Sequence, residues 1–84
     1  MSSAISSTLT LVGRFDPAVM IRFSVSRSEL LRIHATVVTA TEHRIELHTH
    51  GDPDLVGAFE AACALAPDDN VVLDLTSTER KVPS

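Results

Sequence analysis

Apolar and polar side chains alternate from residue 8 to residue 15, which places Leu9, Leu11 and Phe15 on one face of an extended backbone. An alternation with a period of two is typical of a strand that buries one of its faces. The pair Asp16-Pro17 comes directly after it and predicts the end of this strand. We therefore expect the chain to open with a half-buried strand over residues 8–15.

The next segment, residues 19–33, fits both a helix and a strand. One helical stripe would collect four apolar side chains: Met20, Phe23, Leu30 and Leu31. Alternating apolar residues over 21–25 fit a strand instead, and residues 24–26 are weak helix formers. A capping box at residues 26–29 would allow a helix to begin late. Of these alternatives we expect a helix from about Val19.

Two strand-like runs, residues 33–40 and 44–51, flank a turn at residues 41–43. If the turn is centred on Glu42, four apolar side chains share the inner face of the hairpin: Ala35, Val37, Ile45 and Leu47. The same register sets three pairs on the outer face: His34 opposite His50, Thr36 opposite His48, and Val38 opposite Glu46. The hairpin therefore gathers three histidines on one surface, with His43 at the turn.

Asp52-Pro53 then supplies an N-cap residue and a proline suited to the first position of a helix. This helix would direct one apolar stripe toward the sheet: Leu55, Phe59, Ala62, Cys63 and Ala66. Residues 67–70 end the helix, and residues 71–75 form a last strand bounded by residues 76–78. We expect a flexible leader at 1–7, a domain at 8–77 and a flexible tail at 78–84.

The order of these elements is β-α-β-β-α-β. It predicts an α+β, ferredoxin-like sandwich, in which two helices cover one face of an antiparallel four-stranded sheet. This arrangement occurs in many unrelated proteins, so it indicates the fold without indicating a function.

Composition narrows the classes of function. The chain has 84 residues, enough for one small domain, and its 11 acidic and 7 basic side chains give a formal charge of -4. This charge provides no attraction to nucleic acid or to an anionic membrane. A single cysteine cannot form an internal disulfide, and the chain shows no signal peptide and no membrane-spanning run. We expect a cytoplasmic protein.

Residues 13–51 resemble the acylphosphatase family without a gap. Three motifs carry the resemblance: Gly13-Arg14 at the start of the family's Gly-Arg-Val-Gln-Gly-Val-Gly-Phe-Arg loop, Ile45-Glu46 on its third strand, and His50-Gly51 at the closing glycine. Residues 54–67 are similar to the family's second helix with its Gly-Pro end. The resemblance implies the ferredoxin-like fold and a strand-to-helix loop that binds phosphate.

Acylphosphatases hydrolyse carboxyl-phosphate anhydrides. The resemblance implies that loop N–H groups and an arginine hold the phosphate while an asparagine positions the attacking water. Six residues form the counterpart of this loop: Asp16, Pro17, Ala18, Val19, Met20 and Ile21. Pro17 has no N–H to donate, and Asp16 would bring a negative charge beside a dianion. Ile21 and Thr39 stand at the arginine and asparagine positions, so we expect a degenerate site that has lost catalysis.

Two functions stay open on this sequence. In one, a one-residue shift of the alignment to the family's loop lets Arg22 hold the phosphate, and Thr39 orients a water. The protein would then be a weak acylphosphatase. In the other, the protein is a pseudoenzyme, a small binding or self-associating module that uses the sheet face bare of helices. Residues 71–75 also resemble a strand of STAS domains, but the serine-bearing loop of those domains is missing.

The bare sheet face would carry His34, His48 and His50. Imidazole pairs at cross-strand spacing can bind a metal ion or respond to pH, but no cysteine or second carboxylate completes a site here. Solvated strand residues are the simpler interpretation, so we expect no metal and no cofactor. The expected partner is an unidentified small molecule or protein, or a second copy in a homo-oligomer. Cys63 is expected in the core rather than as a nucleophile.

Overall fold

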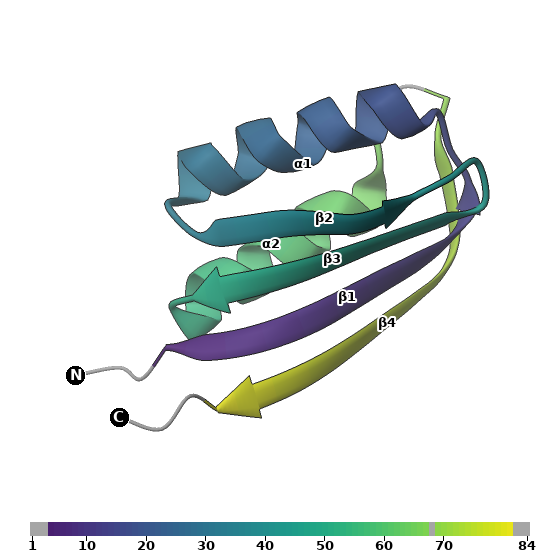
Figure 1. Ribbon diagram of the computed structural model, residues 1–84. Helices are drawn as coiled ribbons and strands as arrows, with labels where there is room; N and C mark the ends of the chain where they lie inside the picture. Colours follow the sequence, from purple (N-terminus) through teal and green to yellow (C-terminus); the bar gives the residue numbers. More distant parts are fainter. Residues whose placement is uncertain (1–3, 68, 82–84) are drawn as a thin grey trace.

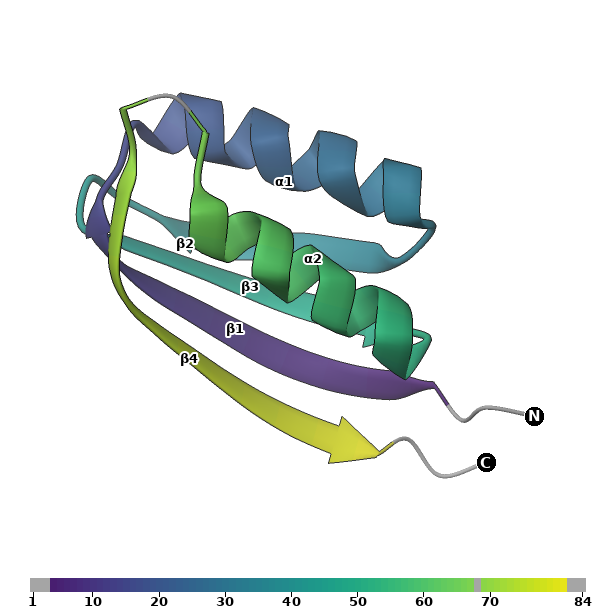
Figure 2. The same ribbon diagram turned by 180° about the vertical axis from the view of Figure 1, so that it is seen from behind.

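The computed structural model describes residues 4–67 and 69–81, and the elements follow the predicted order (Figure 1). Their bounds are β1 Ile5–Arg14, α1 Pro17–Leu31, β2 His34–Ala40, β3 Arg44–Gly51, α2 Pro53–Leu65 and β4 Val71–Lys81. The strands pair antiparallel in the order β2-β3-β1-β4. Both helices lie on the same side of this sheet, as Figure 2 shows from behind. The predicted ferredoxin-like fold is confirmed.

The core lies between the sheet and the two helices. The inner faces of β1 and β3 supply Leu9, Leu11, Ile45 and Leu47, all of which are buried as the alternation predicted. Ala35 and Val37 of β2 are partly buried against them. The helices add the fully buried apolar side chains of Met20, Val56, Phe59 and Cys63. Leucine, isoleucine and valine therefore fill most of a core that contains few aromatic rings.

Helix α1 begins at Pro17, earlier than the predicted start at Val19, and residues 21–25 are helical. Its predicted apolar stripe is wrong at Leu30, which is 70% exposed. The buried stripe contains Met20, Ser24 and Ser28 instead. The hydroxyl of Ser24 donates to the Met20 carbonyl oxygen at 2.8 Å, so a small polar side chain is satisfied within the helix while buried.

Helix α2 begins at Pro53 as predicted, but its buried stripe is rotated from the predicted one. Val56, Phe59 and Cys63 are buried, whereas Leu55 is 38% exposed. The spacings of three and four residues from Val56 match the 3.6-residue turn as closely as those from Leu55 do. The sequence pattern alone could not choose between the two rotations.

The hairpin has the predicted register at its open end, where His34 lies opposite His50 and Thr36 opposite His48. The predicted pair of Val38 and Glu46 is wrong, because Thr39 lies opposite Glu46. The register shifts between Val37 and Thr39, so one extra residue on β2 is accommodated by a bulge.

Both outer limits of the sheet differ from those predicted. Strand β1 begins at Ile5 rather than Thr8, since Ile5 is buried and its backbone pairs with β3 and β4. Strand β4 extends to Lys81 rather than Leu75, because residues 76–81 continue the antiparallel pairing with β1. The paired strands therefore reach into the segments expected as leader and tail; residues 1–3 and 82–84 of those segments lie outside the described residues.

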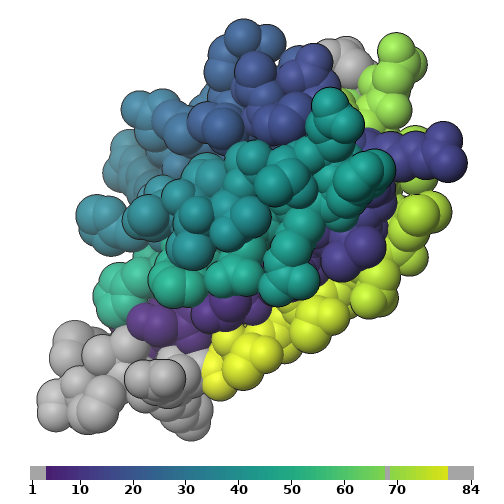
Figure 3. Space-filling model, turned by 45° about the vertical axis from the view of Figure 1, so that its right-hand side comes forward, coloured from purple at the N-terminus to yellow at the C-terminus, as the bar shows by residue number. Residues whose placement is uncertain are grey.

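The opposite side of the sheet is not covered by either helix. In Figure 3 the side chains of β2 and β3, of β1 and of β4 form adjacent teal, purple and yellow areas of one surface. We call this surface the open face. Among residues 4–67 and 69–81, no helix is long and apolar enough to cross a membrane.

Candidate functional site

The loop between β1 and α1 contains only Phe15 and Asp16. Of the six residues expected to form the phosphate-binding loop, only Asp16 lies outside the helix. The other five, from Pro17 to Ile21, form the start of α1. The chain therefore turns directly from strand to helix at the place where the resemblance implies an extended cradle.

Asp16 is the N-cap residue of this helix. Its carboxylate Oδ1 accepts hydrogen bonds from the N–H groups of Ala18, at 3.1 Å, and Val19, at 3.3 Å. The N–H of Met20 donates to the Asp16 carbonyl oxygen at 3.0 Å, and Pro17 has no N–H. The first turn of a helix attracts anions through its unpaired N–H groups. Here an anionic side chain of the same chain already accepts from them.

The two N–H groups just before the helix also donate within the chain. The N–H of Phe15 donates to the carbonyl oxygen of Glu42 at 2.8 Å, and the N–H of Asp16 donates to Oδ1 of Asn70 at 2.6 Å. Asn70 is itself held by a bond from its Nδ2 to the Pro67 carbonyl oxygen at 2.7 Å. The turn before β3 and the segment before β4 therefore fix the loop from two sides.

Two shallow hollows, which we call the loop hollows, flank this connection. One has a volume of about 570 Å³ and is lined by Arg14, Phe15, Asp16, Val19, Asp69 and Asn70. The other has a volume of about 640 Å³ and is lined by Arg14, Phe15, Asp16, Pro17, Glu42 and His43. Among the described residues, the lining of each loop hollow contains one arginine and two carboxylates. This balance of charge disfavours a dianionic ligand.

Neither Arg22 nor Thr39 lines the loop hollows. Arg22 is exposed on α1, and Thr39 is half-buried on β2 opposite Glu46. The arginine that does line both hollows is Arg14. Arg14 and Asn70 were not predicted as site residues. Arg14 belongs to the Gly13-Arg14 pair that carries the family resemblance, whereas Asn70 comes from a distant segment and no local pattern marks it.

The open face contains a third hollow, which we call the histidine hollow. It has a volume of about 490 Å³, and its lining includes His34, His48 and His50 together with Ser6, Thr36, Thr78 and Glu79. The ring centres of His34 and His50 are 6.4 Å apart, with the ring planes at 43°. Ser6 Oγ lies 3.1 Å from Nδ1 of His50. His43 lines a loop hollow instead.

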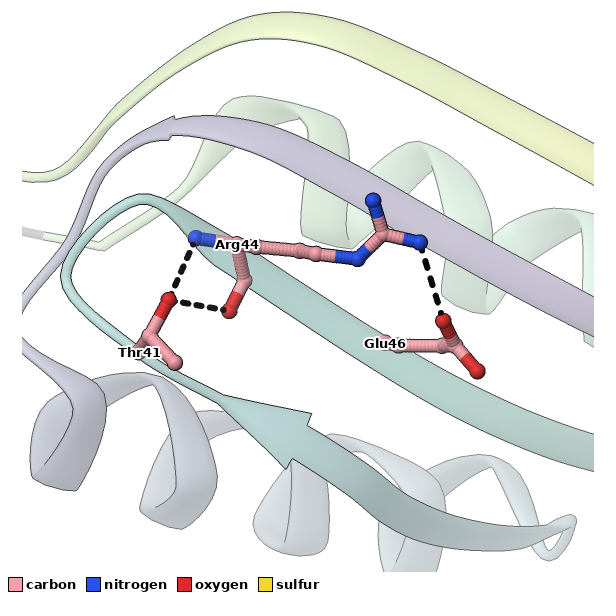
Figure 4. Close-up of polar contacts among 3 residues, drawn as sticks. All are labelled: Thr41, Arg44 and Glu46. Carbon is pink, nitrogen blue, oxygen red and sulfur yellow. Dashed lines mark hydrogen bonds and ion pairs between the residues drawn. The ribbon is translucent and has the colours of Figure 1, made fainter.

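The opposite end of the hairpin is held by the contacts drawn in Figure 4. Thr41 Oγ1 accepts from the N–H of Arg44 at 2.9 Å and donates to the Arg44 carbonyl oxygen at 3.2 Å. The guanidinium of Arg44 forms an ion pair with Glu46 at 3.1 Å. A solvent-exposed pair of this kind contributes at most about 1 kcal/mol. The contacts of Thr41 stabilise the turn. The ion pair joins the Arg44 guanidinium to a carboxylate of the same strand, β3.

Solved structures share this fold. An acylphosphatase from Bacillus subtilis superposes with a TM-score of 0.82 and 17% identity, over 90% of this chain and 84% of that one. An acylphosphatase from Coxiella burnetii gives a TM-score of 0.80 and 20% identity, over 98% of this chain and 86% of that chain. Full-length HypF, in a phosphate- and nucleotide-bound form, gives a TM-score of 0.69 and 15% identity, over 93% of this chain and 10% of that chain. The chain is therefore an acylphosphatase-like domain in its fold.

No family model matches the sequence, and no curated protein matches it. At these identities the likeness concerns the path of the backbone and not the residues of a site. Since one fold can serve many activities, the function has to be argued from the loop and the open face of this chain.

Proposed function

We propose that this protein is an acylphosphatase-like pseudoenzyme, a cytoplasmic module that binds a partner without hydrolysing acyl phosphates. One observation carries the proposal: the Asp16 carboxylate accepts from the Ala18 and Val19 N–H groups at the start of α1. A phosphate that bound there would have to displace a covalently attached anion. It would also lie beside the charge of that anion.

The energetic argument concerns the transition state of hydrolysis. Removal of a single donor that stabilises developing negative charge commonly lowers the rate by a factor of about 100 to 1000. In this chain Pro17 contributes no donor, and two further donors already have an acceptor. Ile21 supplies no charge at the position that the family resemblance assigns to arginine. Together these losses remove several of the groups that would stabilise the negative charge of the transition state.

The open face is the surface that supports a binding role. It is free of helices, and its histidine hollow contains imidazole and hydroxyl groups that can donate and accept hydrogen bonds. The partner we expect is a small molecule, a protein or a second copy of the chain. The charge of -4 argues against a nucleic acid or an anionic membrane.

The test combines an assay with a titration. We expect the protein to hydrolyse benzoyl phosphate no faster than buffer does. We also expect inorganic phosphate to leave the ¹H–¹⁵N signals of residues 16–22 and of Thr39 unchanged. Saturable shifts at these residues, together with turnover above buffer, would refute the proposal.

A gain-of-binding variant tests the physical reason. Asp16→Gly combined with Pro17→Gly removes the internal carboxylate and restores one N–H, and glycine is accepted at the N-cap. We expect this double variant to show saturable phosphate shifts in the first turn of α1. Asp16→Asn is the matched control, because it keeps a side chain that caps the helix while removing the charge. A double variant that folds but ignores phosphate would show that Asp16 is not the cause.

The second candidate is a weak acylphosphatase, the alternative that the resemblance of residues 13–51 to the family leaves open. It would use Arg22 to hold phosphate and Thr39 to orient water. If turnover is found, Arg22→Ala and Thr39→Ala should each lower kcat about 100-fold in a folded protein. Turnover that survives both substitutions would exclude this candidate as well.

A further inference from the structure

Two imidazoles lie opposite each other on the open face. His34 of β2 and His50 of β3 occupy directly paired positions, at the end of the hairpin away from the turn. Side chains at such positions leave the sheet on the same side, with Cβ atoms about 5 Å apart. The ring centres are 6.4 Å apart. The backbone pairing therefore fixes the two rings as neighbours.

One of these rings is oriented by a contact from the next strand. Ser6 Oγ lies 3.1 Å from Nδ1 of His50, and Ser6 and His50 are themselves paired across β1 and β3. A hydrogen bond to one ring nitrogen sets the ring orientation and leaves the other nitrogen as a ligand. His50 is half-buried, whereas His34 is exposed and has room to adjust.

The sequence alone favours solvated histidines without a metal, but the paired geometry of the rings points the other way. We propose that His34 and His50 bind one divalent transition-metal ion of the zinc and copper class on the open face. Two imidazoles that share an ion through one nitrogen each have ring centres roughly 4.5 to 5.5 Å apart, because the metal–nitrogen distance is about 2.1 Å. A small rotation of the exposed His34 side chain closes the difference from 6.4 Å. Imidazole is a preferred ligand of Zn²⁺, Cu²⁺ and Ni²⁺.

The site has two protein ligands. In the part of the chain that the structure describes, no group of three or more histidine, cysteine, aspartate or glutamate side chains is arranged to hold a metal ion. Water or a group from a partner therefore completes the coordination. An ion with open positions can link the open face to a ligand or to a second copy of the chain. The site is on the open face and does not depend on whether the loop at Asp16 is catalytic.

The experiment titrates Zn²⁺ into the full chain, without an affinity tag and freed of metal by a chelator. Calorimetry near neutral pH should give one ion per chain, and imidazole NMR signals of His34 and His50 should shift together. Cu²⁺ should bind more tightly than Zn²⁺. Binding should weaken in acid, where protons compete for the ring nitrogens.

Four single variants identify the ligands. His34→Asn and His50→Asn should each lower the affinity by about tenfold or more, and Ser6→Ala should lower it by about tenfold through loss of the orienting contact. His43→Asn is the matched control, since it removes an exposed imidazole at the other end of β3 and should leave the affinity unchanged.

Three results would overturn the assignment. They are the absence of saturable Zn²⁺ binding, equal binding by the His34→Asn/His50→Asn double variant, and loss of binding in His43→Asn. None of these results depends on the hydrolysis assay, so the metal site and the loss of catalysis can fail separately.

Discussion

Gly13 lies where β1 changes register against β4. A Cβ atom built at this residue would lie 1.9 Å from the carbonyl oxygen of Val71, which is much closer than two such atoms can approach. The N–H of Gly13 also donates to the carbonyl oxygen of His43 at 3.1 Å. The glycine of the Gly13-Arg14 pair is therefore required for the packing of β4 and says nothing about catalysis.

This close approach predicts opposite effects at two glycines. Gly13→Ala should destabilise the protein by about 2 kcal/mol or more, because the backbone of β4 has to move. Gly57→Ala should stabilise it by about 0.5–1 kcal/mol, since Gly57 lies within helix α2 and a Cβ atom there meets nothing within 4 Å. Urea unfolding measures both. An equal effect of the two substitutions would contradict the register shift as the reason.

Cys63 is fully buried, and its burial raises the pKa of the thiol to about 12, with a smaller contribution from the nearby Glu60 carboxylate. The native thiol should therefore react slowly with Ellman's reagent and quickly after unfolding. Because the folded pKa lies above the unfolded value of 9.0, the resulting stability is fully present below about pH 9. It should be lost as the pH rises toward 12.

The measurement is the free energy of unfolding from about pH 8 to about pH 11, compared with Cys63→Ala. The chain has no tyrosine, so few other groups titrate in this range. The alanine variant should show a flatter decline with pH, whatever its stability at neutral pH. Parallel curves would show that the thiol makes no contribution.

Helix α1 is defined by the residues at its two ends. Asp16 caps the N-terminus, Pro17 takes the first turn, and Arg32 ends the helix in a left-handed conformation with φ 57°. The N–H of Arg32 donates to the Glu29 carbonyl oxygen at 3.2 Å. The interior contains Ser24 and other weak helix formers, so propensity contributes little and the caps and the packing define the element.

This arrangement predicts a stabilising substitution at the C-terminal end. Arg32→Gly should raise the free energy of unfolding by about 0.5–1 kcal/mol, because glycine adopts the left-handed conformation without strain. Arg22→Gly is the control within the same helix, and it should lower the free energy by about 1 kcal/mol. Thermal unfolding followed by circular dichroism measures both. A destabilising Arg32→Gly would mean that the arginine side chain contributes more than the strain costs.

One polar cluster joins three elements that are distant in the sequence. The Glu60 carboxylate of α2 accepts hydrogen bonds from Ser7 of β1 and Ser77 of β4, and the two hydroxyls lie 3.0 Å apart. Ser7 is buried, so its hydroxyl needs an acceptor within the protein. This cluster ties α2 to the half of β4 that the alternation in the sequence did not reveal.

Replacement of the carboxylate tests that role. Glu60→Ala should lower the free energy of unfolding by about 1–3 kcal/mol, because Ser7 and Ser77 lose their common acceptor. Glu60→Gln keeps an acceptor oxygen and should cost less. Hydrogen exchange should show faster opening of residues 76–81 in Glu60→Ala. Unchanged exchange there would show that β4 is held by its backbone pairing with β1 alone.

The same Asp-Pro pair occurs twice in the sequence, and the two helix starts were not predicted equally well. Asp52-Pro53 and Asp16-Pro17 are the same pair, and both begin a helix. The pair at Asp52 correctly predicts the start of a helix, whereas the pair at Asp16 predicted a strand end with a helix only from Val19. The difference lies in the helical residues after each pair, because an apolar stripe is clear in α2 and weak in α1. The cap signal was therefore correct at both sites, and the weak stripe after Asp16 led to the later predicted start.

The candidate site shows the same limit. The sequence predicted that Pro17 lacks a donor and that Asp16 brings a negative charge into the loop. It could not show that the Asp16 carboxylate accepts from Ala18 and Val19, since this depends on where the helix begins. It also missed Asn70, which is far from the loop in the chain and bonds the Asp16 N–H.

The order of the elements, the fold class and the inner faces of β1 and β3 follow from patterns in the sequence, because alternation is a local property of the backbone. The rotation of α2, the bulge at Val38 and the extension of β4 to Lys81 come from tertiary contacts. These features depend on which partner each backbone group and side chain meets. Partners distant in the chain leave no periodic pattern in the sequence.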